Sequence, residues 1–309
     1  MTDSKTPSGQ KIAILGTGKM GSAIAARLSE TGSDVALWNR TPSRAEALGL
    51  GTVVDTPAAA AGEADIVISS LTGPEAVLAA YLGPDGALTA GAGKHFVDMS
   101  TAGPDLVADL EPHVSAAGGT LVDAPILGAP PFIRAGTGAI LISGADEDVA
   151  LASQVLSVLG TVRQVGSLGS AARLKLVANS MLADVILAAA ELEVAGEESG
   201  LAADDVFWVL ARFVPQLQAR RGGIVDDRHK PTLFALRDLR KDLDLAAGLF
   251  EPAEVRTPLT AQARELVVAA AAQTPDLDIT AVGRRYRRAR RSPVAQAATP
   301  NPLAASAAG

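Results

Sequence analysis

Short apolar runs alternate with longer amphipathic segments through the first half of the chain. Runs of strand length lie at 11–15, 34–38, 52–54, 65–71, 95–99, 139–143 and 161–165. The segments between them predict helices at 22–31, 74–82, 104–117 and 146–159. Strands that alternate with helices in this way are typical of a mostly parallel sheet with helices on both faces. We therefore predict a doubly wound α/β domain over residues 1–168.

Only the helical period continues beyond this domain. Residues 169–200 are rich in Ala and Leu and contain no proline, which predicts a single helix of about 30 residues. A broad buried surface is expected from Leu174, Val177, Met181, Leu182, Val185, Ile186 and Leu187. Further helices are predicted at 203–213, 233–250, 258–272 and 279–291, with an Arg- and Gly-rich loop at 220–230. We predict an all-helical domain over 201–291, joined to the first domain by the long helix, and a disordered tail over 292–309.

A glycine-rich turn directly follows the first predicted strand. It reads Gly16-Thr17-Gly18-Lys19-Met20-Gly21, which is the spacing G-x-G-x-x-G between a strand and a helix. In this context Gly16 permits a tight turn, Gly18 lets the backbone approach a pyrophosphate, and Gly21 allows close packing of the helix. The N-terminus of that helix would face the phosphates. The sequence therefore predicts a Rossmann-type dinucleotide-binding domain.

The end of the second predicted strand indicates which dinucleotide would bind. An acidic residue there would hydrogen-bond the free ribose 2′-hydroxyl of NAD, but this chain has Asn39, Arg40 and Thr41. A guanidinium and a hydroxyl suit a 2′-phosphate, so we predict NADP rather than NAD. The alternative is that Arg40 is a solvated arginine in a turn.

The long helix carries the candidate catalytic pair, Lys175 and Asn179, which share a face because they are four residues apart. An ammonium and an amide within an apolar surround could serve chemistry. Alternatively, Lys175 extends to water and Asn179 bonds to a loop. The ligand crevice should be lined by loops at the carboxyl ends of the strands. The candidates there are Leu71, Thr72, Ser100, Thr101, Leu127 and Gly128.

Composition narrows the class of protein. The 309 residues are 48% hydrophobic and 20% charged, as expected for a globular protein of two domains. The absence of cysteine excludes disulfides and Cys-ligated metals, and we expect a soluble, cytoplasmic protein with no membrane span and no bound metal. The net charge of -7 argues against general nucleic-acid binding. The six arginines within 284–291 are interpreted as the basic end of a helix.

Five stretches together resemble the β-hydroxyacid dehydrogenase family, which includes 3-hydroxyisobutyrate dehydrogenases and glyoxylate or succinic semialdehyde reductases. They are the turn 16–21, Asp98-Met99-Ser100-Thr101, Asp123-Ala124-Pro125, residues 169–179, and Lys241-Asp242-Leu243. The resemblance covers nearly the whole chain. It implies that Lys175 is the catalytic acid/base, that Asn179 binds substrate, and that Thr101 and Lys241 contact the cofactor. It also implies a dimer or tetramer formed through the helical domain.

The chain departs from the family pattern at two positions. Ala178 replaces the first asparagine of an Asn-Asn pair, and Leu127-Gly128-Ala129 stands where the family commonly has Ser-Gly-Gly. That serine ordinarily holds a substrate carboxylate, so the pocket should be more apolar here. The segment 129–133 also resembles the imine reductases, which reduce cyclic imines with NADPH. Those enzymes usually carry Asp, Tyr or another residue where this chain has Lys175.

The sequence thus predicts an NADP-dependent oxidoreductase acting on a small aldehyde, keto acid or 3-hydroxy acid. Lys175 would supply the proton, Asn179 would orient the reacting oxygen, and Ser100 with backbone N–H groups near Gly128 would hold a carboxylate. An NADPH-dependent imine reductase is the alternative, and a non-catalytic dinucleotide sensor is a third reading. We also predict a homodimer through the helical domain, because the long helix would be partly exposed in a monomer.

Overall fold

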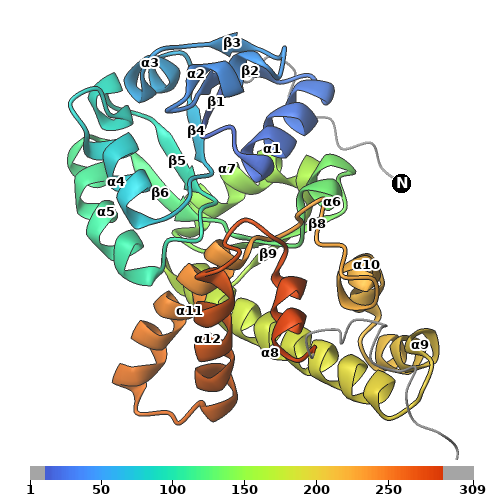
Figure 1. Cartoon of the computed structure of the whole chain (residues 1–309). Helices are drawn as coiled ribbons and strands as arrows, with labels where there is room; N and C mark the ends of the chain where they lie inside the picture. The colour runs from blue at the N-terminus through green and yellow to red at the C-terminus, as the bar shows by residue number, and fades with distance from the viewer. Residues whose placement is uncertain (1–10, 288–309) are drawn as a thin grey trace, which may run out of the picture.

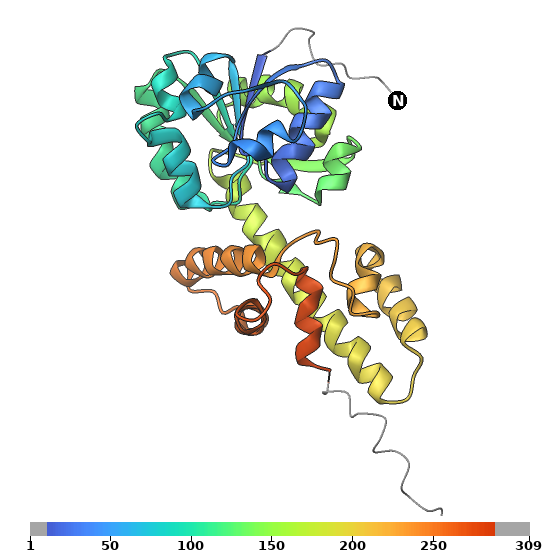
Figure 2. The same cartoon turned by 45° about the horizontal axis from the view of Figure 1, so that its top comes forward.

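A computed structural model describes residues 11–287. The leader before Lys11 and the predicted tail over 292–309 lie outside the described residues. Helix α8 (Ser170–Glu198) joins a sheet-containing domain to a helical domain, and Figure 2 shows it running from one into the other. This arrangement is the one that the change of hydrophobic period predicts.

The first domain contains a six-stranded sheet in the order β3-β2-β1-β4-β5-β6, with every neighbouring pair parallel. The strands are β1 (Lys11–Leu15), β2 (Asp34–Trp38), β3 (Thr52–Val53), β4 (Ile66–Ser69), β5 (His95–Asp98) and β6 (Thr120–Asp123). The predicted doubly wound fold is confirmed. The strand order reverses between β1 and β4, and a ligand crevice is expected at that point, outside the carboxyl ends of the strands.

Each face of this sheet is covered by its own set of helices. Ile12 and Ile14 pack on one face with α1 (Lys19–Glu30) and α7 (Asp146–Leu156), while Ala13 and Leu15 pack on the other. That second face is covered by α3 (Pro57–Gly62), α4 (Pro74–Leu82) and α5 (Pro104–Ala116). A strand buried on both faces is apolar throughout, which explains the unbroken apolar run at 11–15. Helix α1 begins three residues earlier than predicted, inside the glycine-rich turn.

The strands predicted at 139–143 and 161–165 do not extend the large sheet. They form β8 (Gly138–Ile142) and β9 (Gly160–Gln164) of a separate sheet, with β7 (Ile126–Leu127) pairing antiparallel to β8. Only an antiparallel bridge between Asp123 and Ser143 connects the end of β6 to this second sheet. Because this isolated bridge is the only pairing between the two sheets in the described residues, β7, β8 and β9 form a sheet of their own.

Residues between the predicted elements include short helices that the hydrophobic pattern did not indicate. They are α2 (Pro42–Glu46), α3, and α6 (Pro130–Arg134), each with a proline in its first turn. These helices have five or six residues, too few to display a helical period.

The helical domain packs around the second half of α8, as Figure 1 shows. Its described elements are α9 (Ala203–Phe213), α10 (Arg221–Ile224), α11 (Leu236–Phe250), α12 (Pro258–Ala271) and three 3₁₀ helices, Pro215–Arg220, Glu251–Ala253 and Ile279–Arg285. Helix α10 lies in the segment predicted as a loop. The helix predicted at 279–291 is a 3₁₀ helix that ends at Arg285, and residues 288–291 of that prediction lie outside the described part.

The buried face of α8 differs from the predicted one. Ala183, Ile186 and Leu187 are buried against the helical domain, whereas Leu174, Val177 and Met181 are exposed by 43%, 48% and 62%. The exposed residues fall at intervals of three and four and therefore form a stripe. No other element between residues 11 and 287 covers this stripe, so the expectation that these three residues are buried was wrong for the described part of a single chain.

Candidate functional site

The glycine-rich turn has the geometry that a dinucleotide requires. Gly16 has φ of 101°, a conformation that favours glycine, and a Cβ placed on Gly21 would lie 1.9 Å from the carbonyl oxygen of Gly16. By contrast, a Cβ on Gly18 would meet no atom within 4 Å, so the backbone there faces open space. Gly16 and Gly21 thus make the close turn, and Gly18 leaves room for a phosphate group.

Two polar features of this turn also fit a bound dinucleotide. The hydroxyl of Thr17 is buried and, within the described residues, has no hydrogen-bond partner. Helix α1 has no side-chain cap at Gly18, so its first N–H groups are available to an anion. The side chain of Met20 packs against the apolar core on the sheet face that α1 and α7 cover. The residues of the turn therefore fit a pyrophosphate, which a polar donor and a helix N-terminus would bind.

At the end of β2, the three predicted cofactor residues have different roles. The side chain of Asn39 accepts a hydrogen bond from the Thr17 backbone N–H at 3.0 Å and donates to the Thr41 carbonyl at 2.9 Å. Asn39 therefore fixes the glycine turn against β2. Arg40 and Thr41 are exposed beside it. Their side chains are free to meet a ribose or its 2′-phosphate.

Buried hydrogen bonds join the loops that follow β4 and β5. The Asp98 carboxylate accepts from the Ser69 hydroxyl at 2.7 Å and the Ser100 backbone N–H at 3.1 Å, and the Ser100 hydroxyl accepts from the Leu71 N–H at 2.9 Å. Burial raises the pKa of Asp98, while its bonds from Ser100 and Ser69 oppose that rise. The predicted substrate residue Ser100 is itself buried and serves these loops. Leu71, exposed Thr72 and half-buried Thr101 lie on the loops that it holds together.

Lys175 and Asn179 lie on one face of α8, beside a carboxylate that sequence reasoning did not single out. The buried amide of Asn179 donates to Asp242 of α11 at 2.5 Å, and Lys241 forms an ion pair with the same carboxylate at 2.6 Å. Lys241 also donates to the Thr101 carbonyl. One carboxylate therefore holds Asn179 and Lys241. The sequence signal that could have identified Asp242 was the motif Lys241-Asp242-Leu243, in which an acid lies between a lysine and an apolar leucine.

Lys175 as a whole residue is half-buried, and its ammonium has no hydrogen-bond partner among the described residues. Burial lowers the pKa of Lys175 to about 8; Asp242 opposes this shift, and the positive charge of Lys241 adds to it. Burial conversely raises the pKa of Asp242, against the nearby charges of Lys241 and Lys175. A lysine with a pKa near neutrality can both give and accept a proton, as a general acid/base must.

The loop after β6 brings Leu127 and Gly128 toward α8, because β7 contacts that helix. Leu127 is half-buried, and Gly128 has φ of 136°, which a residue with a side chain rarely adopts. Phe132 lies 3.7 Å from the position that a Cβ on Gly128 would take. Leu127 and Phe132 therefore offer apolar side chains, and no hydroxyl, in this segment.

Two lysines, one from each domain, donate hydrogen bonds to carbonyls of the other domain. Lys19 of the glycine turn donates to the carbonyl of Thr232 in the helical domain at 2.7 Å, and Lys241 donates in the opposite direction to Thr101. An open groove of about 510 Å³ borders Lys241 and includes Pro74 and Arg237. Helix α11 thus closes over the loops that follow β4 and β5.

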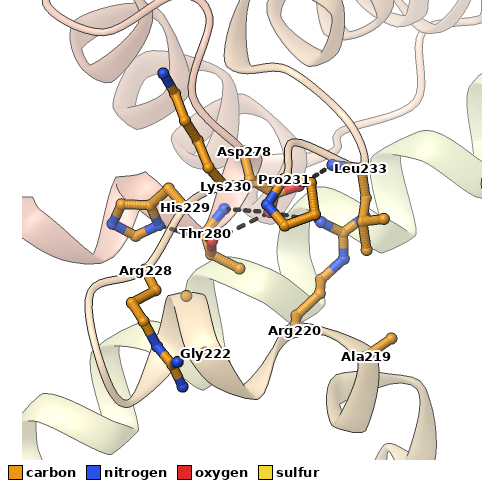
Figure 3. A pocket seen from close by; sticks show the side chains of 11 residues that line it. Ala219, Arg220, Gly222, Arg228, His229, Lys230, Pro231, Leu233, Asp278 and Thr280 are labelled. Atoms are coloured by element: carbon orange, nitrogen blue, oxygen red, sulfur yellow. Dashed lines mark hydrogen bonds and ion pairs between the residues drawn. The ribbon is translucent and has the colours of Figure 1, made fainter. Parts of the chain in front are cut away.

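A separate cavity of about 210 Å³ lies within the helical domain, and Figure 3 shows its lining. Its polar groups bond mainly to one another: Arg220 pairs with Asp278 at 2.6 Å, and His229 bonds to Thr280 at 3.0 Å. His229 is buried. The described residues contain no cluster of His, Cys, Asp or Glu that could hold a metal. They also contain no helix with the length and apolarity needed to cross a bilayer.

The fold and the site together define a class of two-domain proteins that bind a nicotinamide dinucleotide. The features of this class are the strand order of the parallel sheet, a glycine turn that fits a pyrophosphate, and an interdomain helix that carries a titratable lysine. Comparisons with known proteins agree. Residues 11–169 match the NAD binding domain of 6-phosphogluconate dehydrogenase, and residues 169–286 match the NAD-binding domain of NADP-dependent 3-hydroxyisobutyrate dehydrogenase. The chain belongs to the β-hydroxyacid dehydrogenase family of NAD(P)-dependent enzymes.

Similar proteins include both enzymes and longer nuclear proteins. The chain is 30% identical to glyoxylate/succinic semialdehyde reductase 2 of Arabidopsis thaliana, with 88% of this chain and 78% of the relative covered. It is 32% identical to the cytokine-like nuclear factor N-PAC of Xenopus tropicalis, with 91% and 54% covered. The chain therefore spans about half the length of the N-PAC proteins that it matches.

Solved structures of related enzymes share the fold of this chain. The 3-hydroxyisobutyrate dehydrogenase of Mycobacterium tuberculosis, solved with L-serine, is 27% identical with a TM-score of 0.80, covering 90% of this chain and 99% of that one. The reductive aminase of Aspergillus terreus, solved with NADPH and ethyl levulinate, is 25% identical with a TM-score of 0.59, covering 91% and 100%.

Proposed function

We propose that this chain is an NADP-dependent oxidoreductase that transfers a hydride between nicotinamide and a small aldehyde, keto acid or 3-hydroxy acid, with Lys175 as general acid/base. The observation that carries the proposal is the half-buried residue Lys175, with its pKa lowered to about 8, beside Asn179 and Asp242. Membership of the family and the similarity to a glyoxylate/succinic semialdehyde reductase support the substrate class.

The dinucleotide would be held by the turn Gly16–Gly21 and by the loops at Leu71-Thr72 and Thr101. When bound, it would supply the hydride in reduction and accept it in oxidation. In reduction, the Lys175 ammonium donates a proton to the substrate oxygen, and in oxidation the neutral amine takes it back. Asn179 orients the same oxygen, since its amide is anchored by Asp242. Leu127 limits water on the opposite side of the pocket.

NADPH is the proposed cofactor because no carboxylate stands at the end of β2. Exposed Arg40 and Thr41 offer a guanidinium and a hydroxyl to a 2′-phosphate, and Asn39 is occupied in holding the glycine turn. A charge-assisted pair with Arg40 would favour NADPH over NADH by about tenfold or more.

Imine reduction is the second candidate function, and Leu127 is the observation that favours it. An apolar residue at this position suits a substrate without a carboxylate, and an NADPH-bound reductive aminase shares the fold. Lys175 opposes this alternative, because an imine that arrives protonated requires no general acid.

The proposed assembly is a homodimer through the helical domain. Its support is the exposed stripe of Leu174, Val177 and Met181 on α8, together with Trp208 and Phe213 of α9. Exposed apolar area of this kind favours association with another surface. A second copy of the chain would cover it.

The test of the proposed function is the Lys175→Ala variant, assayed for NADPH oxidation with glyoxylate, succinic semialdehyde and a cyclic imine. The proposal expects wild-type turnover of at least one carbonyl substrate and a fall in kcat by about 10²- to 10⁴-fold in the variant, with the NADPH dissociation constant unchanged. Lys11→Ala, which removes an exposed lysine, is the matched control. Wild-type carbonyl rates in Lys175→Ala would refute the role of Lys175, and turnover of the imine alone would favour the alternative.

A further inference from the structure

The N-cap residue of the long helix α8 is Gly169, which has no side chain to cap the first turn and has φ of 86°. Two residues of the sheet domain, Asp123 and Ser143, supply the cap instead. The backbone N–H groups of Gly169 and Ala172 donate to the Asp123 carboxylate at 2.9 and 2.6 Å, and that of Ala171 donates to the Ser143 hydroxyl at 3.0 Å. The first turn of α8 is therefore anchored to the sheets rather than to its own sequence.

Asp123 and Ser143 are both buried, and they are fixed to each other. The Ser143 hydroxyl donates to Asp123, and two backbone hydrogen bonds, 3.1 and 3.0 Å long, join the same two residues. This bridge lies where the end of β6 meets the end of β8. The residues that cap α8 therefore lie at the junction of the two sheets, where three hydrogen bonds hold them to each other.

The position of Asp123 relates it to both sides of the proposed active site. Lys175 follows Ala172 by three residues, which is about 4.5 Å along the helix axis. Leu127, the last residue of β7, follows Asp123 by four residues, and only Ala124 and Pro125 separate β6 from β7. The Asp123 carboxylate therefore connects the segment that leads to Leu127 with the turn of α8 that precedes Lys175.

We propose that Asp123 is a positioning residue, which sets where the Lys175 ammonium lies relative to the Leu127–Gly128 loop through its hydrogen bonds to the first turn of α8. The inference rests on the proposed function, because it concerns the lysine that supplies the proton. An acceptor with two oxygens is required: Asp123→Asn would keep one acceptor and turn an NH₂ group toward a backbone N–H. The first turn would then shift or fray, and a displacement of about 1 Å can cost about 10²-fold in rate.

The experiment compares Asp123→Asn and Ser143→Ala with Thr56→Ala. Thr56 caps α3 through a 3.0 Å bond to the Ala59 N–H, in the same domain but on a helix without proposed site residues. Each variant is assayed well below its unfolding temperature for kcat, KM, NADPH dissociation constant and the pH dependence of carbonyl reduction. We expect kcat to fall about 10- to 100-fold in Asp123→Asn and at least about threefold in Ser143→Ala, with NADPH affinity retained.

A purely structural cap would lower the melting temperature and leave the pH profile unchanged, as expected for Thr56→Ala. Positioning predicts in addition that the fall of the rate with pH moves to higher pH in Asp123→Asn, because a displaced ammonium is less desolvated. Wild-type kcat and pH profile in Asp123→Asn, while Lys175→Ala is inactive, would overturn this inference alone. An active Lys175→Ala would instead refute the proposed function. If Asp123→Asn does not fold, an unchanged kcat in Ser143→Ala overturns the inference.

Discussion

The pH dependence of the reaction tests the assignment of Lys175 most directly. With a pKa of about 8, Lys175 is about nine-tenths protonated at pH 7 and about one-tenth protonated at pH 9. Reduction of a carbonyl requires the protonated form, so its kcat/KM should fall about tenfold between these two pH values. Oxidation of the alcohol requires the neutral form and should rise over the same interval. A lysine with its ordinary pKa would stay protonated over this interval, so the rate of reduction would be nearly unchanged between the two pH values.

The assay follows the absorbance of reduced nicotinamide in both directions, with a substrate that the wild-type protein turns over. Asp242→Asn identifies the titrating group, because the negative charge of Asp242 opposes the lowering of the Lys175 pKa. Its removal should move the fall in reduction rate to lower pH. Lys175→Arg should abolish this titration, since a guanidinium does not deprotonate in this range. A flat profile for the wild type, or a fall that stays in place in Asp242→Asn, would contradict the assignment.

Two further changes test the cofactor and the assembly. Arg40→Ala should weaken NADPH binding by about tenfold and leave NADH binding unchanged, as measured by titration of each cofactor; equal affinities of the wild type for both would refute the proposed preference. Met181→Glu places a charge in the exposed stripe of α8 and should convert a dimer to a monomer in light scattering at micromolar concentration. A wild-type protein that is monomeric and active under those conditions would exclude the proposed dimer.

The sequence predicted the large sheet well because each of its strands is a short apolar run bounded by turns. The strand at 11–15 and the turn after it were found together, since the glycine spacing has a physical meaning only between a strand and a helix. The separate sheet formed by β7, β8 and β9 was missed, because the choice of strand partners depends on the bridge between Asp123 and Ser143. Such a bridge joins residues 20 positions apart and leaves no periodic signal.

The candidate site was predicted less completely than the fold. Lys175 and Asn179 were recognisable from their spacing on one helix, but Asp242 lies on another helix 63 residues beyond Asn179. Hydrophobic pattern alone could not place the two side chains together. The same limit explains Leu174 and Met181, which read as core residues because an apolar stripe looks alike whether its cover comes from the same chain or from outside it.

The contact between Lys19 and the Thr232 carbonyl has an electrostatic consequence. A carbonyl carries no net charge, and within residues 11–287 no carboxylate pairs with Lys19, so its positive charge lies beside the positive end of α1. The chain as a whole carries -7, which repels a polyphosphate at long range. At physiological ionic strength this repulsion is screened beyond about 8 Å, whereas the attraction of Lys19 acts inside that distance. Physiological salt therefore weakens the long-range repulsion between the chain and the cofactor more than it weakens the short-range attraction of the cofactor to Lys19.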